Sequence, residues 1–158
     1  MTRSYYAPHG GLPPQTDLIT DRAIFTEAYA VIPRREFSDI VASYLPHWEK
    51  TRAWVIARPL SGFAETFSQY VMEVLPGGGS DKPEPDEGAE GVFFVVEGEL
   101  TVTFGGADHV LTPGGYAFLP PGAKWAARNI GSAPARFHWI RKAYEQVDGI
   151  AVPEAIFA

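Results

Sequence analysis

The chain has 158 residues, of which 46% are hydrophobic and 20% charged, a balance typical of one globular domain and not of a disordered chain. Its net charge of −6 would repel nucleic acid and anionic membranes, so we expect neither as a partner. The absence of cysteine excludes disulfides, thiolate metal sites and a cysteine nucleophile. The start MTRSYYAPHGG has no apolar signal-peptide core, and we expect a soluble protein of the cytoplasm.

The N-terminal part is predicted to be an arm that leads into the folded domain. Residues 1–20 are polar and rich in proline and glycine, which is typical of an extended arm. Residues 24–32 have the character of a strand, which Pro33 would end. Within residues 37–45 the apolar side chains recur at i, i+3, i+4, i+7 and i+8, which predicts a short helix ended by Pro46.

The rest of the sequence predicts one short strand after another. Residues 92–96 are continuously apolar, so we expect both faces of that strand to be covered, whereas residues 99–104 alternate between polar and apolar. The other strands are expected at residues 53–58, 67–75, 110–111, 116–119, 124–128 and 136–141. Turns rich in glycine and proline separate them, as in an all-β sandwich or barrel. The chain thus divides into an arm with lead-in strands (1–50), a β-barrel (51–145) and a linker or tail (146–158).

The segment from Gly114 to Asn129 carries the most specific pattern. Five residues after Gly114 comes Pro120-Pro121-Gly122, followed at fixed intervals by Trp125 and Asn129. This pattern resembles the second motif of the cupin superfamily, G-x5-P-x-G-x2-H-x3-N, with tryptophan in place of the histidine. The resemblance implies an all-β cupin fold, which is a double-stranded β-helix or jelly-roll barrel with little helix.

The region from Gly77 to Gly98 resembles the first cupin motif, G-x5-H-x-H-x3,4-E-x6-G, at its closing glycine. Counting back from Gly98 places Gly91 at the glutamate position, with Glu90 one residue early. Residues 84–87, Glu-Pro-Asp-Glu, occupy the region of the two histidines. The motif therefore keeps the turn that shapes the barrel and lacks its usual metal ligands.

These replacements bear on metal binding. A cupin metal site needs imidazole and carboxylate ligands that converge inside the barrel. The indole of Trp125 offers one N–H donor and no ring lone pair, so it cannot bind a metal ion and would fill its space. We therefore expect a barrel with no metal, no cofactor and no catalytic residue in this chain, packed with aromatic side chains. The side chains expected to line its interior are Glu90, Phe93, Phe104, Trp125, Arg128 and His138.

Other polar and aromatic residues admit either a site or a structural role. The acidic run from Asp81 to Glu90 could bind a hard cation or form a solvated loop, and we favour the loop because the Asp-x-Asp-x-Asp-Gly pattern is missing. Only Glu90 of this run is expected to point inward. His138 could face the cavity or the solvent, and His9, His47 and His109 lie outside any ligand spacing. Three tryptophans are expected in the core or in an interface, namely Trp48, Trp54 and Trp139.

The order of further segments narrows the family resemblance. Asp21-Arg22-Ala23 and residues 54–59, 62–70 and 98–121 are together similar to the N-terminal half of the bicupin (S)-ureidoglycine aminohydrolases, also described as glyoxylate-induced proteins. The resemblance implies two cupin barrels in one polypeptide. The second barrel would bind manganese through glutamate, histidine and glutamine and release ammonia from (S)-ureidoglycine in allantoin breakdown. The first would serve structure and assembly.

The resemblance leads to a main hypothesis and two alternatives. In the main hypothesis this chain is the metal-free half of such a hydrolase, partnered by a manganese-binding barrel in the same polypeptide or another subunit. The first alternative is a stand-alone barrel that binds a small molecule such as a ureide through Glu90, Arg128 or His138, without catalysis. The second is an unconventional metalloenzyme using Glu84, Asp86 or Glu90. Because one barrel leaves open sheet edges, we also expect a homo-oligomer, formed barrel to barrel or by strand exchange through residues 1–35.

Overall fold

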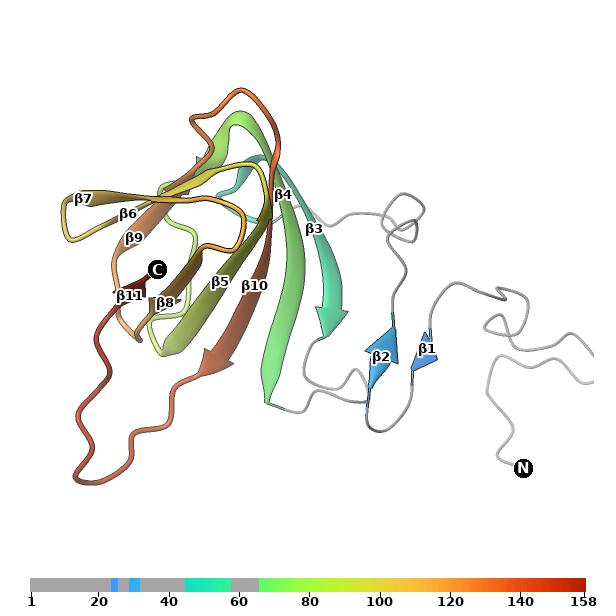
Figure 1. Ribbon diagram of the computed structural model, residues 1–158. Coiled ribbons are helices and arrows are strands. Elements are labelled where there is room, and N and C mark those ends of the chain that lie inside the picture. Colours follow the sequence, from blue (N-terminus) through green and yellow to red (C-terminus); the bar gives the residue numbers. More distant parts are fainter. Residues whose placement is uncertain (1–23, 26–28, 32–44, 58–65) are drawn as a thin grey trace, which may run out of the picture. The chain divides into compact units, whose positions relative to one another are not determined.

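The computed structural model describes residues 24–25, 29–31, 45–57 and 66–158 (Figure 1). These residues belong to two compact units, residues 1–40 and residues 41–158. The expected arm and all of the helix expected at residues 37–45 except Leu45 lie outside the described residues. None of the residues described forms a helix that is long and apolar enough to cross a membrane.

The first unit contains a small pair of strands. β1 (Ile24–Phe25) pairs antiparallel with β2 (Ala30–Val31). The sequence predicted one continuous strand over residues 24–32, and this is wrong because the chain reverses within it. Residues 26–28 are Thr-Glu-Ala and include no glycine, proline, asparagine, aspartate or serine, so no turn was predicted between the two strands.

The second unit is a barrel of nine antiparallel strands (Figure 1). They are β3 (Glu49–Ala57), β4 (Phe67–Ser80), β5 (Ala89–Glu97), β6 (Leu100–Phe104), β7 (Ala107–Leu111), β8 (Tyr116–Leu119), β9 (Trp125–Arg128), β10 (Ala135–Ala143) and β11 (Ile156–Phe157). Their hydrogen-bonded order is β11-β8-β5-β10-β4-β9-β6-β7, with β3 also on β4. The described part of the chain contains no helix, so the predicted all-β cupin barrel is confirmed.

The long strand β4 joins two halves of the barrel, one formed by β11, β8, β5 and β10 and the other by β9, β6 and β7. Its first part pairs with β10, while Gly79 and Ser80 at its end pair with β9. Gly79 has a φ of 132°, and a Cβ there would lie 2.1 Å from the carbonyl oxygen of Ala127. Only glycine allows both this backbone conformation and this close approach. The glycine run that begins at Gly77 therefore lets β4 bend across from one half of the barrel to the other.

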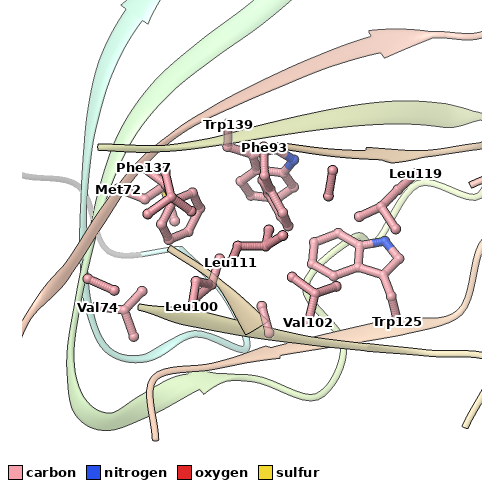
Figure 2. Packing of buried hydrophobic residues seen from close by; sticks show 14 of the residues in the cluster. Met72, Val74, Phe93, Leu100, Val102, Leu111, Leu119, Trp125, Phe137 and Trp139 are labelled. Atoms are coloured by element: carbon pink, nitrogen blue, oxygen red, sulfur yellow. The ribbon is translucent and has the colours of Figure 1, made fainter. Parts of the chain in front are cut away.

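Side chains from both halves of the barrel pack into one core (Figure 2). Its largest fully buried members are Trp139, Phe93 and Phe137. Burial of an apolar side chain of this size stabilises a fold by about 1.5–3 kcal/mol relative to its exposure. Trp48 and Trp54 are buried as well, which confirms the expectation for the three tryptophans.

Only the inner face of β5 is covered by described residues. Phe93 and Val95 are completely buried, whereas Phe94 and Val96 are each 46% exposed. The sequence predicted cover on both faces of residues 92–96, and this is wrong for the outer face. A continuous apolar run shows that both faces are apolar, but it does not show that both are packed.

The C-terminal segment returns to the barrel. After an exposed connection, β11 pairs with β8, and the backbones of Ala158 and Tyr116 exchange two hydrogen bonds of 2.7 and 2.9 Å. The ring of Phe157 stacks on His109 at 3.7 Å between ring centroids and lies 6.0 Å from Phe104. The segment expected to be a linker or tail thus adds a short strand. Two residues are too few for a periodic pattern to reveal.

Candidate functional site

A cavity of about 420 Å³ opens at one end of the barrel, and we call it the mouth cavity. Its walls come from the connection between β4 and β5 and from the turn between β8 and β9. The buried residues Gly91, Leu119 and Trp125 form its barrel side. The two segments that depart from the cupin motifs, residues 84–87 and Trp125, therefore border one space.

Trp125 begins β9 and packs its indole against two other rings. Its ring centroid lies 5.1 Å from that of Phe93 at an interplanar angle of 77°, and 6.0 Å from that of Trp139 at 89° (Figure 2). Edge-to-face pairs of this kind add about 0.5–1.5 kcal/mol each to the stabilisation from buried area. At the position of the motif histidine, the structure thus has an aromatic packing residue.

Gly91 stands at the position of the motif glutamate and lies beside the same aromatic cluster. A Cβ on Gly91 would lie only 3.3 Å from Nε1 of Trp139. Trp139 is 2% exposed, and its Nε1 has no hydrogen-bond partner among the described residues. A glutamate side chain at this position would have to displace the indole. Gly91 and Trp139 are therefore matched to each other in shape.

Glu84 forms the most buried ion pair at the mouth cavity. Both of its carboxylate oxygens accept hydrogen bonds from Arg141 of β10, and the two side chains are only 10% and 22% exposed. The guanidinium carbon of Arg141 lies 5.0 Å from the ring centre of Trp139. Burial alone would lower the pKa of Arg141, but the hydrogen bonds and charge of Glu84, together with smaller contributions from Tyr70, raise the pKa above its ordinary value. Arg141 is therefore charged, and the pair is ionic.

Two other carboxylates of the acidic run are paired near the surface. Arg128 donates to both oxygens of Asp81, at 3.1 and 2.7 Å, and Lys124 donates to Glu87. These hydrogen bonds lower the pKa of Asp81 and that of Glu87 below their ordinary values. Asp81 and Glu87 therefore each pair with a cation from the segment that contains β9 and the turn before it. These pairs link the acidic loop to that part of the barrel.

The motif positions at the mouth cavity offer no donor set for a transition metal. Trp125 has no lone pair to donate, Gly91 has no side chain, and both oxygens of Glu84 are engaged by Arg141. Over residues 24–25, 29–31, 45–57 and 66–158, no group of three histidine, aspartate or glutamate side chains is placed to hold a metal ion. The cavity instead offers an aromatic wall with charged groups around it, which suits the binding of a polar molecule.

The structure brings together three of the six side chains predicted to line the interior, namely Phe93, Phe104 and Trp125. Phe93 and Trp125 are in contact, and Trp125 also lines the mouth cavity. Phe104, at the end of β6, lies directly opposite Trp125 in the pairing of β6 with β9, and it packs against the core and against Phe157. Ligand binding by any of these aromatic residues stays a prediction.

The three polar candidates are spread over the barrel. Arg128 is held in the surface ion pair described above. His138 is half-buried on β10, where its Nδ1 lies 3.1 Å from Nε2 of Gln69, and burial lowers its pKa below the ordinary value. Glu90 lies opposite Lys142 in the pairing of β5 with β10. The described lining of the mouth cavity includes none of the three, and their role as ligand anchors stays a prediction.

Sequence reasoning assigned no role to Arg141, Lys82 or His47. Lys82 and His47 line the mouth cavity, and Arg141 secures Glu84 beside it. The alternation along β10 could have revealed Arg141, because it follows the buried Trp139 by two residues and shares its face. Lys82 and His47 lie in connections whose path is set by tertiary contacts, so no periodic signal identifies them.

Comparisons with known structures agree with this architecture. The cupin domain family matches residues 70–141. A structure described as a glyoxylate-induced protein from Pseudomonas aeruginosa is 62% identical with a TM-score of 0.80, over 99% of this chain and 57% of that chain. The Escherichia coli protein Ylba, at 24% identity and a TM-score of 0.75 over 92% of this chain and 58% of that one, shares the fold.

A curated protein gives the same indication. The (S)-ureidoglycine aminohydrolase of Escherichia coli strain K12 is 25% identical over 135 residues, which make up 85% of this chain and 50% of that protein. This chain thus spans about half the length of the curated relative that it matches. The barrel topology, the motif positions and these matches together show that residues 70–141 form a cupin domain, in a chain similar to the glyoxylate-induced proteins.

Proposed function

We propose that this chain is the metal-free cupin barrel of a two-barrel cytoplasmic enzyme similar to (S)-ureidoglycine aminohydrolase. In that enzyme the other barrel binds manganese and releases ammonia from the ureide, while this barrel supports the assembly. The observation that carries the proposal is the chemistry at the motif positions. There the chain has an indole at Trp125, no side chain at Gly91 and, at Glu84, a carboxylate already paired with Arg141.

The lengths of the relatives support a second barrel. The matched region is 50% of the ureidoglycine aminohydrolase and 57% of the Pseudomonas aeruginosa protein. What is left in each is long enough to form another domain of typical size. In such a protein, the ligands that this barrel lacks would come from the other domain.

Metal content and activity of the 158-residue chain test the proposal. The chain is incubated with excess manganese, desalted and examined by elemental analysis, and it is assayed for ammonia release from (S)-ureidoglycine. We expect far less than one manganese per chain and no ammonia. Stoichiometric manganese, or ammonia released by this chain alone, would overturn the proposal.

A chimera provides the positive control. In it, residues 1–158 replace the matched segment of the Pseudomonas aeruginosa protein, whose remaining part is unchanged. We expect the chimera to bind manganese and to release ammonia, and we expect its Trp125→Phe variant to do both, because the aromatic wall has a structural role. The unmodified Pseudomonas aeruginosa protein is assayed beside it. A folded chimera that neither binds manganese nor releases ammonia, where the unmodified protein does both, contradicts the proposal.

A second candidate function is the binding of a small polar molecule without catalysis, and the mouth cavity favours it. Its volume of about 420 Å³ lies within the range of ligand pockets, and Lys82 and His47 stand beside the wall formed by Trp125. Calorimetric titration with ureides, sugars and small acids tests this candidate. Heat that disappears in a Trp125→Ala variant supports it, and silence across the whole panel counts against it.

A further inference from the structure

The outer side of β5 is apolar along its whole middle section. Since side chains alternate along a strand and Phe93 and Val95 point into the core, Val92, Phe94 and Val96 point outward. Phe94 and Val96 are each 46% exposed. Because these two side chains occupy consecutive outward positions, they form one continuous apolar patch along the strand.

The neighbouring strands extend this apolar surface. Val92 lies opposite Ile140 of β10 on one side and Phe118 of β8 on the other, and Phe118 lies opposite Ile156 of β11. One row of apolar side chains thus crosses four strands, and Ile156 at its end is 52% exposed. We call this surface the outer β5 face. It consists of Val92, Phe94, Val96, Tyr116, Phe118, Ile140 and Ile156, with the half-buried His138 of β10 opposite Phe94.

Charged residues border the outer β5 face at one end. Arg136 of β10 pairs with Glu73 of β4 at 2.7 Å and with Glu97 of β5 at 3.1 Å. About five residues each of β10 and β5, with the four of β8 and the two of β11, give the face a plan area on the order of 250 Å², at about 3.3 Å per residue and about 4.8 Å between strands. An apolar centre with a charged rim is the usual arrangement of a protein interface.

We propose that the outer β5 face docks against a second cupin barrel of the same polypeptide, an inference that rests on the proposed function. The Pseudomonas aeruginosa relative leaves 43% of its length unmatched against 57% matched, so the unmatched part is about three quarters as long as this chain. The compact unit of residues 41–158 is also about three quarters of this chain. The additional part of that relative is therefore the size of one more barrel.

The size of the face favours a tethered barrel over a second copy of this chain. Separate proteins that associate stably bury about 800 Å² on each partner, which is more than this face provides. A domain on the same polypeptide is present at an effective concentration on the order of millimolar, so a smaller contact is sufficient. Phe94 and Phe118 supply the aromatic side chains that usually anchor such a contact.

Thiol labelling tests this docking, because the chain has no cysteine of its own. Val96→Cys probes the outer β5 face, and Val110→Cys on β7 is the matched control, since these valines are 46% and 55% exposed. Each variant is made in the 158-residue chain and in the chimera, and maleimide labelling of the corresponding peptide is followed by mass spectrometry. We expect similar rates for both variants in the chain alone. In the chimera, we expect labelling at least about tenfold slower for Val96→Cys and unchanged for Val110→Cys.

Three outcomes would overturn the proposal. In the first, Val96→Cys is labelled as fast in the folded chimera as in the chain alone. In the second, the chain alone is a dimer by light scattering and already protects this site, which identifies a second copy as the occupant. In the third, the site is protected in the monomeric chain. A chimera that releases ammonia while this site stays fully reactive rejects the docking and leaves the proposed function intact.

Discussion

On the inner face of β5, Phe93 and Val95 are completely buried, while on the outer face Phe94 and Val96 stay about half exposed. The two arginines of β10 differ less. The inward Arg141 is 22% exposed and the outward Arg136 is 39% exposed, and each has one nearly buried carboxylate partner, Glu84 or Glu73. The apolar residues of β5 thus have two roles. Those on the inner face pack into the core of this barrel, and those on the outer face are available to a partner.

The largest effect is expected from a matched pair of truncations on β5. Phe93→Ala leaves a cavity in the core and should lower the free energy of unfolding by about 3–5 kcal/mol, as large-to-small core substitutions do. Phe94→Ala should cost less than about 1 kcal/mol in the 158-residue chain, because this ring is already half exposed. Urea denaturation monitored by circular dichroism measures both.

The chimera sharpens the same comparison. If the outer β5 face is docked there, Phe94→Ala should become clearly more destabilising than in the chain alone, while the cost of Phe93→Ala should not change. Equal costs for the two substitutions in the chain alone would contradict the contrast between the two faces.

The next effect concerns the arginines of β10. Arg141→Met removes the partner of a nearly buried carboxylate and should destabilise by about 3 kcal/mol, because Glu84 is then left without its counter-charge. Arg136→Met should cost less, about 2 kcal/mol, because Arg136 itself is 39% exposed, although its partner Glu73 is only 9% exposed. Thermal unfolding compares the two. Adding Glu84→Gln to Arg141→Met should recover part of the loss, and no recovery would mean that the pair is not the cause.

A smaller effect is expected when the motif histidine is restored. Trp125→His removes the edge-to-face contacts with Phe93 and Trp139 and should destabilise by about 2 kcal/mol. It should not create a manganese site, because Gly91 and the paired Glu84 still offer no free ligand. Elemental analysis after incubation with manganese tests this, and stoichiometric uptake by the variant would show that the indole alone prevents metal binding.

The barrel fold could be predicted from local features of the sequence, whereas the ion pairs could not. Turn residues such as Gly98, with a φ of 72°, and alternating strands allowed the barrel and the altered motif positions to be predicted. Alternation says which side chains share a face, but it cannot say which face is covered, so the cover over Phe94 was predicted wrongly. Glu84 and Arg141 are separated by 57 residues, and only the register of β10 brings them together.

The smallest effect is expected from the titration of His138, whose side chain is half-buried. Burial lowers its pKa in the folded chain below the ordinary value of 6.5, which applies to the unfolded chain. Between these two pKa values the unfolded chain binds more protons, so the stability linked to His138 is complete above about pH 6.5 and declines as the pH falls through 6.5 toward the folded pKa. Urea midpoints measured between pH 7.5 and 5.5 should therefore decrease.

A His138→Gln variant isolates this contribution from the other titrating groups. Glutamine keeps a polar side chain within reach of Gln69 and carries no proton that titrates in this range. The difference in urea midpoint between the two proteins should be larger at pH 7.5 than at pH 5.5, in favour of the unmodified chain. The carboxylates of Asp81 and Glu87, whose pKa values are lowered, lose their contribution only at more acidic pH, so they do not produce this difference. If the difference between the proteins is the same at both pH values, the imidazole titrates alike in the folded and unfolded chains, and His138 belongs with the solvated groups.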